Sequence, residues 1–200
     1  MLNSECLLHL THKVLERNNF QVAKINEVIM LAYLFVVLAV AVRFLPHPLA
    51  FTPVAAALLY FGARAPRKQA WVPLALLAAS DILLTKFVYG YPFTLDHAVT
   101  FAWYAAVLWM GGFLRADSKP LRIAGTSLAA AVTFFLTSNF AVWAVWNMYP
   151  KTMSGLAEAY IAGLPFFRNE IASDLFFSAV MFSIGALVSD RAPEAARIAA

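Results

Sequence analysis

The polar groups best suited to chemistry stand inside apolar stretches of this chain. Ser80 and Asp81 follow a mostly apolar run, and Thr85 shares a helical face with Asp81 at the i+4 spacing. A carboxylate at such a position must be paired or protonated. Asp81 is therefore either a ligand-binding group or one end of a structural hydrogen bond to a neighbouring helix, with Asn139 or a threonine as the expected partner.

Two further stripes of polar and aromatic residues appear at helical spacing. Asn139 and Trp143 share one face, which Trp146 or Asn147 extends. This face is suited to lining a pocket for a large, flat, amide-rich ligand, or equally to packing two helices together through the Asn139 amide. The third stripe begins at Asn169 and continues through Ser173 and Phe177, with Asp174 alongside.

Several kinds of chemistry have no basis in the sequence. There is no Walker A, HExxH or GxSxG motif, so the chain is not expected to be an enzyme of those classes. The single cysteine, Cys6, excludes an internal disulfide and a Cys/His metal cluster. His9 and His12 share a helical face, which is weak evidence for a metal, while His47 and His97 fall in loops where they could contact a ligand.

The composition requires an environment other than water. Apolar residues make up 62% of the 200 residues and charged residues 13%, and the mean hydropathy is +0.71. A soluble domain is typically about half apolar and a quarter charged. A net charge of +4 is too small and scattered to suggest nucleic acid. Since a helix needs roughly 20 residues to cross about 30 Å of hydrocarbon, the chain can hold about six crossings and little else.

The apolar runs predict an all-α integral membrane protein with six transmembrane helices. They lack the alternation of a membrane β-barrel. The predicted division is a cytoplasmic amphipathic segment at 1–27, a six-helix membrane domain at 28–190 and a cytoplasmic tail at 191–200. The six expected helices are 28–45, 52–63, 71–88, 98–114, 123–146 and 171–188.

Lys and Arg in the loops predict the orientation. With the N-terminus in the cytoplasm, 11 of the 15 Lys and Arg residues lie on the inner side and four on the outer side. Both termini are then cytoplasmic. The four outer cations are Arg43, Lys86, Lys151 and Arg168. The basic amphipathic segment at 1–27 is then expected to lie on the inner membrane surface, as an anchor or as a contact for a partner protein.

The outer loops are long and rich in aromatic residues and proline, which predicts a binding surface facing outward. An aromatic belt at the lipid interface is the alternative for any single residue. The outer aromatic residues expected to contact a ligand are Phe51, Tyr89, Tyr91, Tyr160, Phe166 and Phe167.

The strings PHP-x-x-FTPV (from Pro46) and SNF-x-VW (from Ser138) make residues 28–190 resemble a group of small bacterial inner-membrane proteins. These are related to the substrate-binding S-components of energy-coupling factor (ECF) transporters, and the group most similar is the ECF-type vitamin B12 transporter family, BtuM. The resemblance implies a six-helix S-component fold. It also implies cobalamin or cobinamide bound near the outer face, with Asn139 and Asn169 bonding its amides, and release inside by tilting of the whole protein.

The resemblance also implies a residue beneath the corrinoid cobalt. Many relatives carry a cysteine just before the Asp of the third helix, and this thiol is expected to ligate the metal and help remove an upper cyanide. Here the position is Ser80. A hydroxyl is a far poorer cobalt ligand than a thiolate, so binding is expected to persist while decyanation is not.

The first expected helix lacks the Ala-x-x-x-Ala pattern with which many S-components dock on an ECF ATPase module. We therefore expect a solitary transporter for a corrinoid, in the bacterial inner membrane, rather than one that needs the module. Two alternatives remain open at this point. One is an S-component for another vitamin or small metabolite, with Asp81 and Asn139 as specificity groups. The other is a membrane-bound protein that processes corrinoids.

Overall fold

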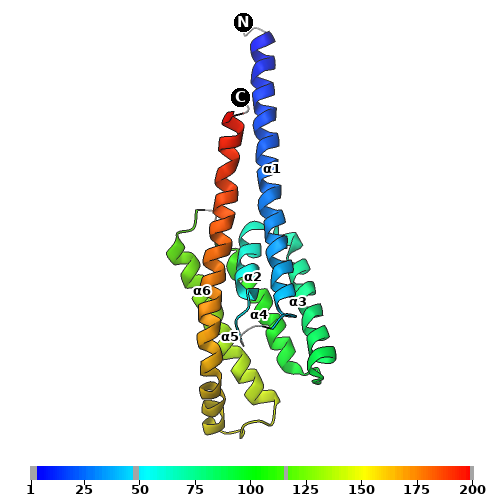
Figure 1. The fold of residues 1–200 in the computed structure, drawn as a ribbon, viewed down its shortest axis with the longest axis vertical. Coiled ribbons are helices and arrows are strands. Elements are labelled where there is room, and N and C mark those ends of the chain that lie inside the picture. The colour runs from blue at the N-terminus through cyan, green and yellow to red at the C-terminus, as the bar shows by residue number, and fades with distance from the viewer. Residues whose placement is uncertain (1–3, 47–49, 115–116, 199–200) are drawn as a thin grey trace.

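A computed structural model describes the backbone of residues 4–46, 50–114 and 117–198, and the side chains of those between 12 and 189. All regular structure in these ranges is helical and none is strand, so the predicted all-α class is confirmed. Figure 1 shows the helices gathered in one bundle, with both chain ends at the same end of it. The helices are α1 (Ser4–Val42), α2 (Val54–Arg64), α3 (Trp71–Leu83), α4 (Leu95–Gly111), α5 (Pro120–Val145) and α6 (Met153–Ile198), with a 3-10 turn at Arg67–Gln69 and a π-helical turn at Leu84–Tyr89.

Four helical stretches in the described ranges are long and apolar enough to cross a membrane. Two of the six expected helices are shorter than these four stretches. They are α2, with 11 residues, and α4, with 17. The long apolar stretches indicate a membrane-embedded protein. They are His12–Val42, Arg67–Tyr89, Pro120–Val145 and Met153–Ser189.

The short helix α2 lies at the centre of the bundle. Its residues from Val54 to Phe61 are all buried, and it packs against α1, α4, α5 and α6. At a rise of 1.5 Å per residue, 11 residues cover roughly 16 Å, about half of a bilayer core. Irregular backbone at membrane depth is tolerated where protein surrounds it, so neighbouring helices can shelter the ends of α2.

Glycine allows α2 and α4 to cross closely. A Cβ atom on Gly62 would overlap the backbone carbonyl of Leu108, and a Cβ on Gly111 would overlap that of Leu59. Small residues of this kind are typical of helix contacts in membranes. On its other side α2 places the Tyr60 ring between α1 and α6, edge-on to Phe35 and Phe182 at centroid distances of 5.0 and 5.2 Å.

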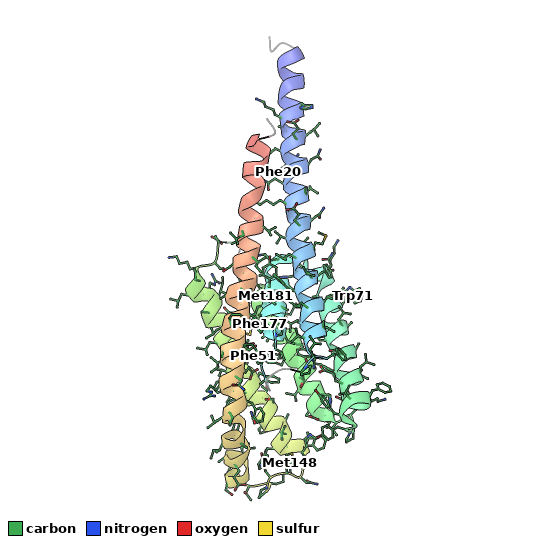
Figure 2. All side chains as sticks on the ribbon, in the orientation of Figure 1. Phe20, Phe51, Trp71, Met148, Phe177 and Met181 are labelled. Atoms are coloured by element: carbon green, nitrogen blue, oxygen red, sulfur yellow. The ribbon has the colours of Figure 1, made fainter. Side chains whose placement is uncertain are left out.

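The outer surface of the bundle is apolar, as lipid contact requires. Large apolar side chains such as Met30, Trp71, Trp109 and Leu121 are all at least 65% exposed. Trp71 points away from the bundle in Figure 2. A water-soluble protein rarely exposes so much contiguous apolar surface, so these residues support a lipid-facing perimeter.

Two long helices differ from what the sequence predicts. The amphipathic segment at 1–27 was expected to lie flat on the membrane, but α1 continues without a break from Ser4 to Val42 and projects along its own axis (Figure 1). The expected outer loop at 147–169 is helical from Met153, and α6 then runs to Ile198 through the expected tail. Pro165, expected near a helix start, therefore lies well inside α6.

Candidate functional site

A cavity of about 250 Å³ lies where the chain passes from α1 to α2. Its walls come from every helix after α1 and from the segments that flank α2 in sequence, so residues far apart along the chain meet there. The lining residues are Arg43, Ala50, Thr52, Val54, Ala55, Asp81, Leu84, Thr85, Tyr89, Trp103, Tyr104, Phe134, Glu170 and Asp174.

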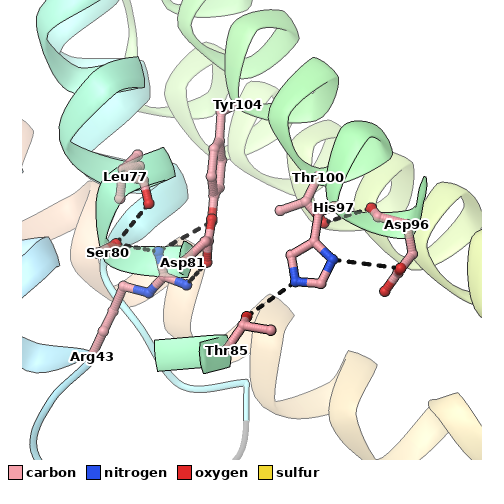
Figure 3. A network of polar contacts seen from close by, with 9 residues as sticks. All are labelled: Arg43, Leu77, Ser80, Asp81, Thr85, Asp96, His97, Thr100 and Tyr104. Atoms are coloured by element: carbon pink, nitrogen blue, oxygen red, sulfur yellow. Dashed lines mark hydrogen bonds and ion pairs between the residues drawn. The ribbon is translucent and has the colours of Figure 1, made fainter. Parts of the chain in front are cut away.

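An ion pair forms one wall of this cavity. Arg43 directly follows α1, and its Nη2 pairs with Oδ1 of Asp81 on α3. The guanidinium also donates from Nη1 to Ser80 Oγ at 2.9 Å and to Tyr104 Oη at 3.2 Å. Tyr104 on α4 donates in turn to Asp81 Oδ2 at 2.9 Å. Figure 3 shows these four side chains converging from three parts of the chain.

This network satisfies both Asp81 oxygens, which removes the cost of burying an unpaired charge. The partner of Asp81 was expected to be Asn139 or a threonine, and that expectation is wrong: Arg43 and Tyr104 take this role. Ser80 is 2% exposed, accepts from Arg43 and donates to the Leu77 carbonyl at 2.7 Å. Its hydroxyl is therefore already engaged within the bundle.

A second arm of polar contacts extends from the cavity to the start of α4. Thr85 lines the cavity, and its Oγ1 lies 3.0 Å from His97 Nε2. The His97 ring stacks on Phe93 at 4.2 Å, and its Nδ1 lies within reach of the Thr94 backbone, where α4 begins. These contacts hold the segment between α3 and α4 against the cavity. His47, the other histidine expected to contact ligand, lies outside the described residues.

Two acids on α6 form the opposite wall. Glu170 and Asp174 are four residues apart, so they share one helical face, and they are 9% and 3% exposed. Oδ2 of Asp174 is buried and has no hydrogen-bond partner among the described residues. Next to it, Ser173 donates to the Thr52 carbonyl at 2.8 Å, which fixes α6 against the segment leading into α2. Both acids lie well inside α6.

The structure brings together only part of the expected ligand-binding set. Asp81 and Tyr89 line the cavity, and Ser80 lies beside it in the Arg43 network. The Phe51 ring packs on that of Phe177 of α6, with the ring centroids 5.5 Å apart. Figure 2 labels the two residues close together along α6.

The remaining expected residues lie outside the cavity lining. Tyr91 stacks on Tyr89 but is 63% exposed, and Phe166 is also exposed. Asn169 is partly exposed on α6, one residue before Glu170. The other four lie where α5 packs against α6, and they are Asn139, Trp143, Tyr160 and Phe167.

The Asn139 contacts correspond to the packing alternative rather than to a pocket. Its amide donates to the Phe135 carbonyl of its own helix at 2.8 Å. A Cβ atom on Gly163 of α6 would overlap the Asn139 side chain. Asn139 thus fills the space that a glycine leaves on the opposing helix.

The neighbouring aromatic residues hold α5 and α6 together. Tyr160 donates to the Leu136 carbonyl at 2.8 Å, and Phe167 stacks on Phe135 with centroids 4.4 Å apart. Trp143 donates from its indole to the Pro150 carbonyl at 2.9 Å, across the turn between the two helices.

Sequence reasoning missed three residues that face the cavity, which are Arg43, Tyr104 and Glu170, and it noted Asp174 beside a polar stripe without giving it a role. Arg43 was counted only as an outer-loop charge. A signal existed, because an intramembrane acid needs a partner and Arg43 stands at the end of an apolar run. For Glu170 the signal was hidden because its surroundings were assigned to a loop, whereas Asp174 fell inside the expected helix at 171–188.

The comparison with known families assigns the chain to one of them. The model of a family of unknown function, DUF6580, matches residues 23–195. This match covers all of α2 to α5, the second half of α1 and nearly all of α6, so the chain belongs to the DUF6580 family. No curated protein and no solved structure matches it.

Proposed function

We propose that this member of the DUF6580 family binds a small solute at the outer face of a bacterial inner membrane and mediates its uptake. The observation that carries the proposal is the cavity bounded by Arg43 and Asp81 on one side and by Glu170 and Asp174 on the other. Ionisable groups inside membrane helices are costly and mark substrate or ion pathways. A concave site with a few converging polar groups is the usual form of a small-molecule site.

The proposed topology has six crossings, with α2 and α4 as the short ones and both termini inside. The loop cations support it, because the basic turns between α2 and α3 and between α4 and α5 fall at the end of the bundle that carries the termini. The cavity then faces the other side, where a scavenged nutrient arrives.

Cavity size favours a small vitamin or metabolite over a corrinoid. The volume of about 250 Å³ is at the lower edge of the ~300–1,000 Å³ typical of pockets for drug-sized ligands, and a corrinoid is considerably larger. Corrinoid uptake, to which the sequence resemblance points, would need a wider cavity than this one. The proposed role of Ser80 beneath cobalt would also need its bonds to Arg43 and Leu77 to break. Decyanation is the less favoured proposal for the same reason.

A ligand panel with an occluding variant tests the proposal. The full chain in lipid nanodiscs is screened for thermal stabilisation by vitamins and metabolites of all charge classes, with cobalamin and cobinamide included. A ligand present at 100 times its Kd adds about 2.7 kcal/mol of stability, which is readily detected. Thr52→Trp puts a bulky side chain into the cavity, since Thr52 lines it and accepts a hydrogen bond from α6 through its backbone carbonyl.

The matched control is Thr137→Trp, because Thr137 is exposed on α5 and bonds only within its own helix. We expect at least one small solute to stabilise the wild type and the control but not Thr52→Trp. A ligand that stabilises all three proteins equally places its site elsewhere. A red, corrinoid-loaded protein would instead identify cobalamin as the ligand. If none of the compounds stabilises the wild type, solute binding is refuted.

A further inference from the structure

We propose that the solute taken up is a small organic cation, whose ammonium group binds between Glu170 and Asp174 while its apolar part lies against the aromatic wall of the cavity. This inference rests on the proposed uptake function and names the substrate class of that same site. Its basis is an excess of acid over base among the lining residues, in a cavity that aromatic side chains also line.

The charges lining the cavity do not balance. Among the described lining residues Arg43 is the only Lys or Arg, and Asp81 neutralises it through a direct ion pair. Glu170 and Asp174 remain, and no second Lys or Arg lines the cavity within the described ranges. Asp174 is 3% exposed, and its buried Oδ2 has no hydrogen-bond partner in the part of the chain that the structure describes.

An acid buried in this way needs either a proton or a cation. A ligand ammonium meets the need directly, because it supplies positive charge and hydrogen-bond donors to two carboxyls on one helical face. The cavity at about 250 Å³ has room for a compact amine.

The other walls select the kind of cation. Trp103, Tyr104, Phe134 and Tyr89 line the same cavity, and aromatic faces attract organic cations within about 6 Å of the ring. A divalent metal would instead need several oxygen or nitrogen ligands. Among the described residues there is no group of three or more His, Cys, Asp or Glu that could hold a metal. The combination of two acids with aromatic rings therefore favours an organic ammonium.

The test compares cations with neutral compounds of the same shape. Binding to the full chain in nanodiscs is measured for choline against its neutral carbon isostere, dimethylbutanol, and for benzylamine against benzyl alcohol. Benzylammonium can donate charge-assisted hydrogen bonds to the two carboxyls, whereas the quaternary nitrogen of choline supplies positive charge without an N–H donor. We expect at least one of the two cations to bind at least about tenfold more tightly than its neutral counterpart.

Variants then place the cation. Asp174→Asn and Glu170→Gln are each expected to weaken binding by about tenfold. Glu158→Gln is the control, because Glu158 is exposed on the same helix and outside the cavity. Removing a buried unpaired charge should not unfold the protein, and the thermal midpoint of each variant checks this. The comparison with neutral isosteres in the wild type is independent of any variant.

A second pair of variants separates an organic cation from sodium. Phe134→Leu is expected to weaken amine binding by roughly 2- to 30-fold, whereas Phe140→Leu, an exposed change on the same helix, is not. Stabilisation by sodium chloride that requires Glu170 and Asp174 but not Phe134 would overturn the proposal in favour of an inorganic cation.

The neutral isosteres and the ligand panel distinguish failure of this inference from failure of the proposed function. If neutral or anionic solutes stabilise the wild type but not Thr52→Trp, while neither amine binds better than its isostere, the organic-cation proposal is refuted and solute uptake stands. If no compound of any class binds, both fall together.

Discussion

Breaking the Arg43–Asp81 pair should destabilise the bundle strongly. The two side chains are 16% and 10% exposed, so each depends on the other for compensation of its charge. Removing one partner of a buried pair leaves the other charge unpaired, which typically costs 3–5 kcal/mol. Because the pair retains some exposure, we expect Asp81→Asn and Arg43→Gln each to lose about 3 kcal/mol.

The double variant should lose less than the sum of the single changes. With both charges removed, no uncompensated ion remains, and the coupling energy between contacting residues is expected to be about 1–3 kcal/mol. The measurement is unfolding by sodium dodecyl sulfate in mixed micelles, followed by tryptophan fluorescence. Arg168→Gln, an exposed change on α6, serves as the control.

Additivity would refute this account of the ion pair. Independent sites add within about 0.3–0.5 kcal/mol. If the losses in the Arg43 and Asp81 single variants sum to that of the double variant within this range, the two charges do not stabilise each other. Asp81 would then have to pair with a residue other than Arg43.

Two further predictions contrast paired substitutions on the helix contacts. Gly163→Ala should destabilise the protein by about 1–3 kcal/mol, because the added Cβ would meet Asn139. Gly125→Ala has open space around it and should stabilise the protein by about 0.5–1 kcal/mol. The thermal midpoints of the two variants should therefore shift in opposite directions, and shifts in the same direction would contradict this. Ser127 donates to Ser178 at 2.7 Å in a buried contact between α5 and α6, so either serine changed to Ala should cost about 1–3 kcal/mol and the double change far less. Chemical unfolding of the three variants measures this, and a double change costing the full sum would contradict it.

Sequence reasoning was most reliable where a single physical constraint acts. Lipid requires apolar helices, so each of the six apolar runs in the sequence corresponds to a helix of the bundle. The predicted bounds of α2 and α5 are correct to within a few residues. It failed where helices continue into polar sequence. The stretch from Met153 to Asn169 contains Pro165 and several polar residues, which indicated a loop, yet α6 passes through it.

The site was harder to predict because pairing depends on which helices are neighbours. Asp81 could be recognised from its apolar surroundings, but the choice of Arg43 over Asn139 depends on α1 ending beside α3. The spacing of Asn139 and Trp143 gave the correct shared face. It could not tell a ligand pocket from the contact with Gly163, because a glycine on the opposing helix leaves no pattern around Asn139.

The most direct test of an outward-facing binding cavity is the accessibility of Thr52 to a membrane-impermeant maleimide. Thr52→Cys is placed in a Cys6→Ser background, and intact right-side-out vesicles are labelled from outside. Because Thr52 lines the cavity and is partly exposed, we expect labelling without permeabilisation, slowed by a solute that stabilises the wild type. Labelling that occurs only after the membrane is permeabilised would contradict an outward-facing site.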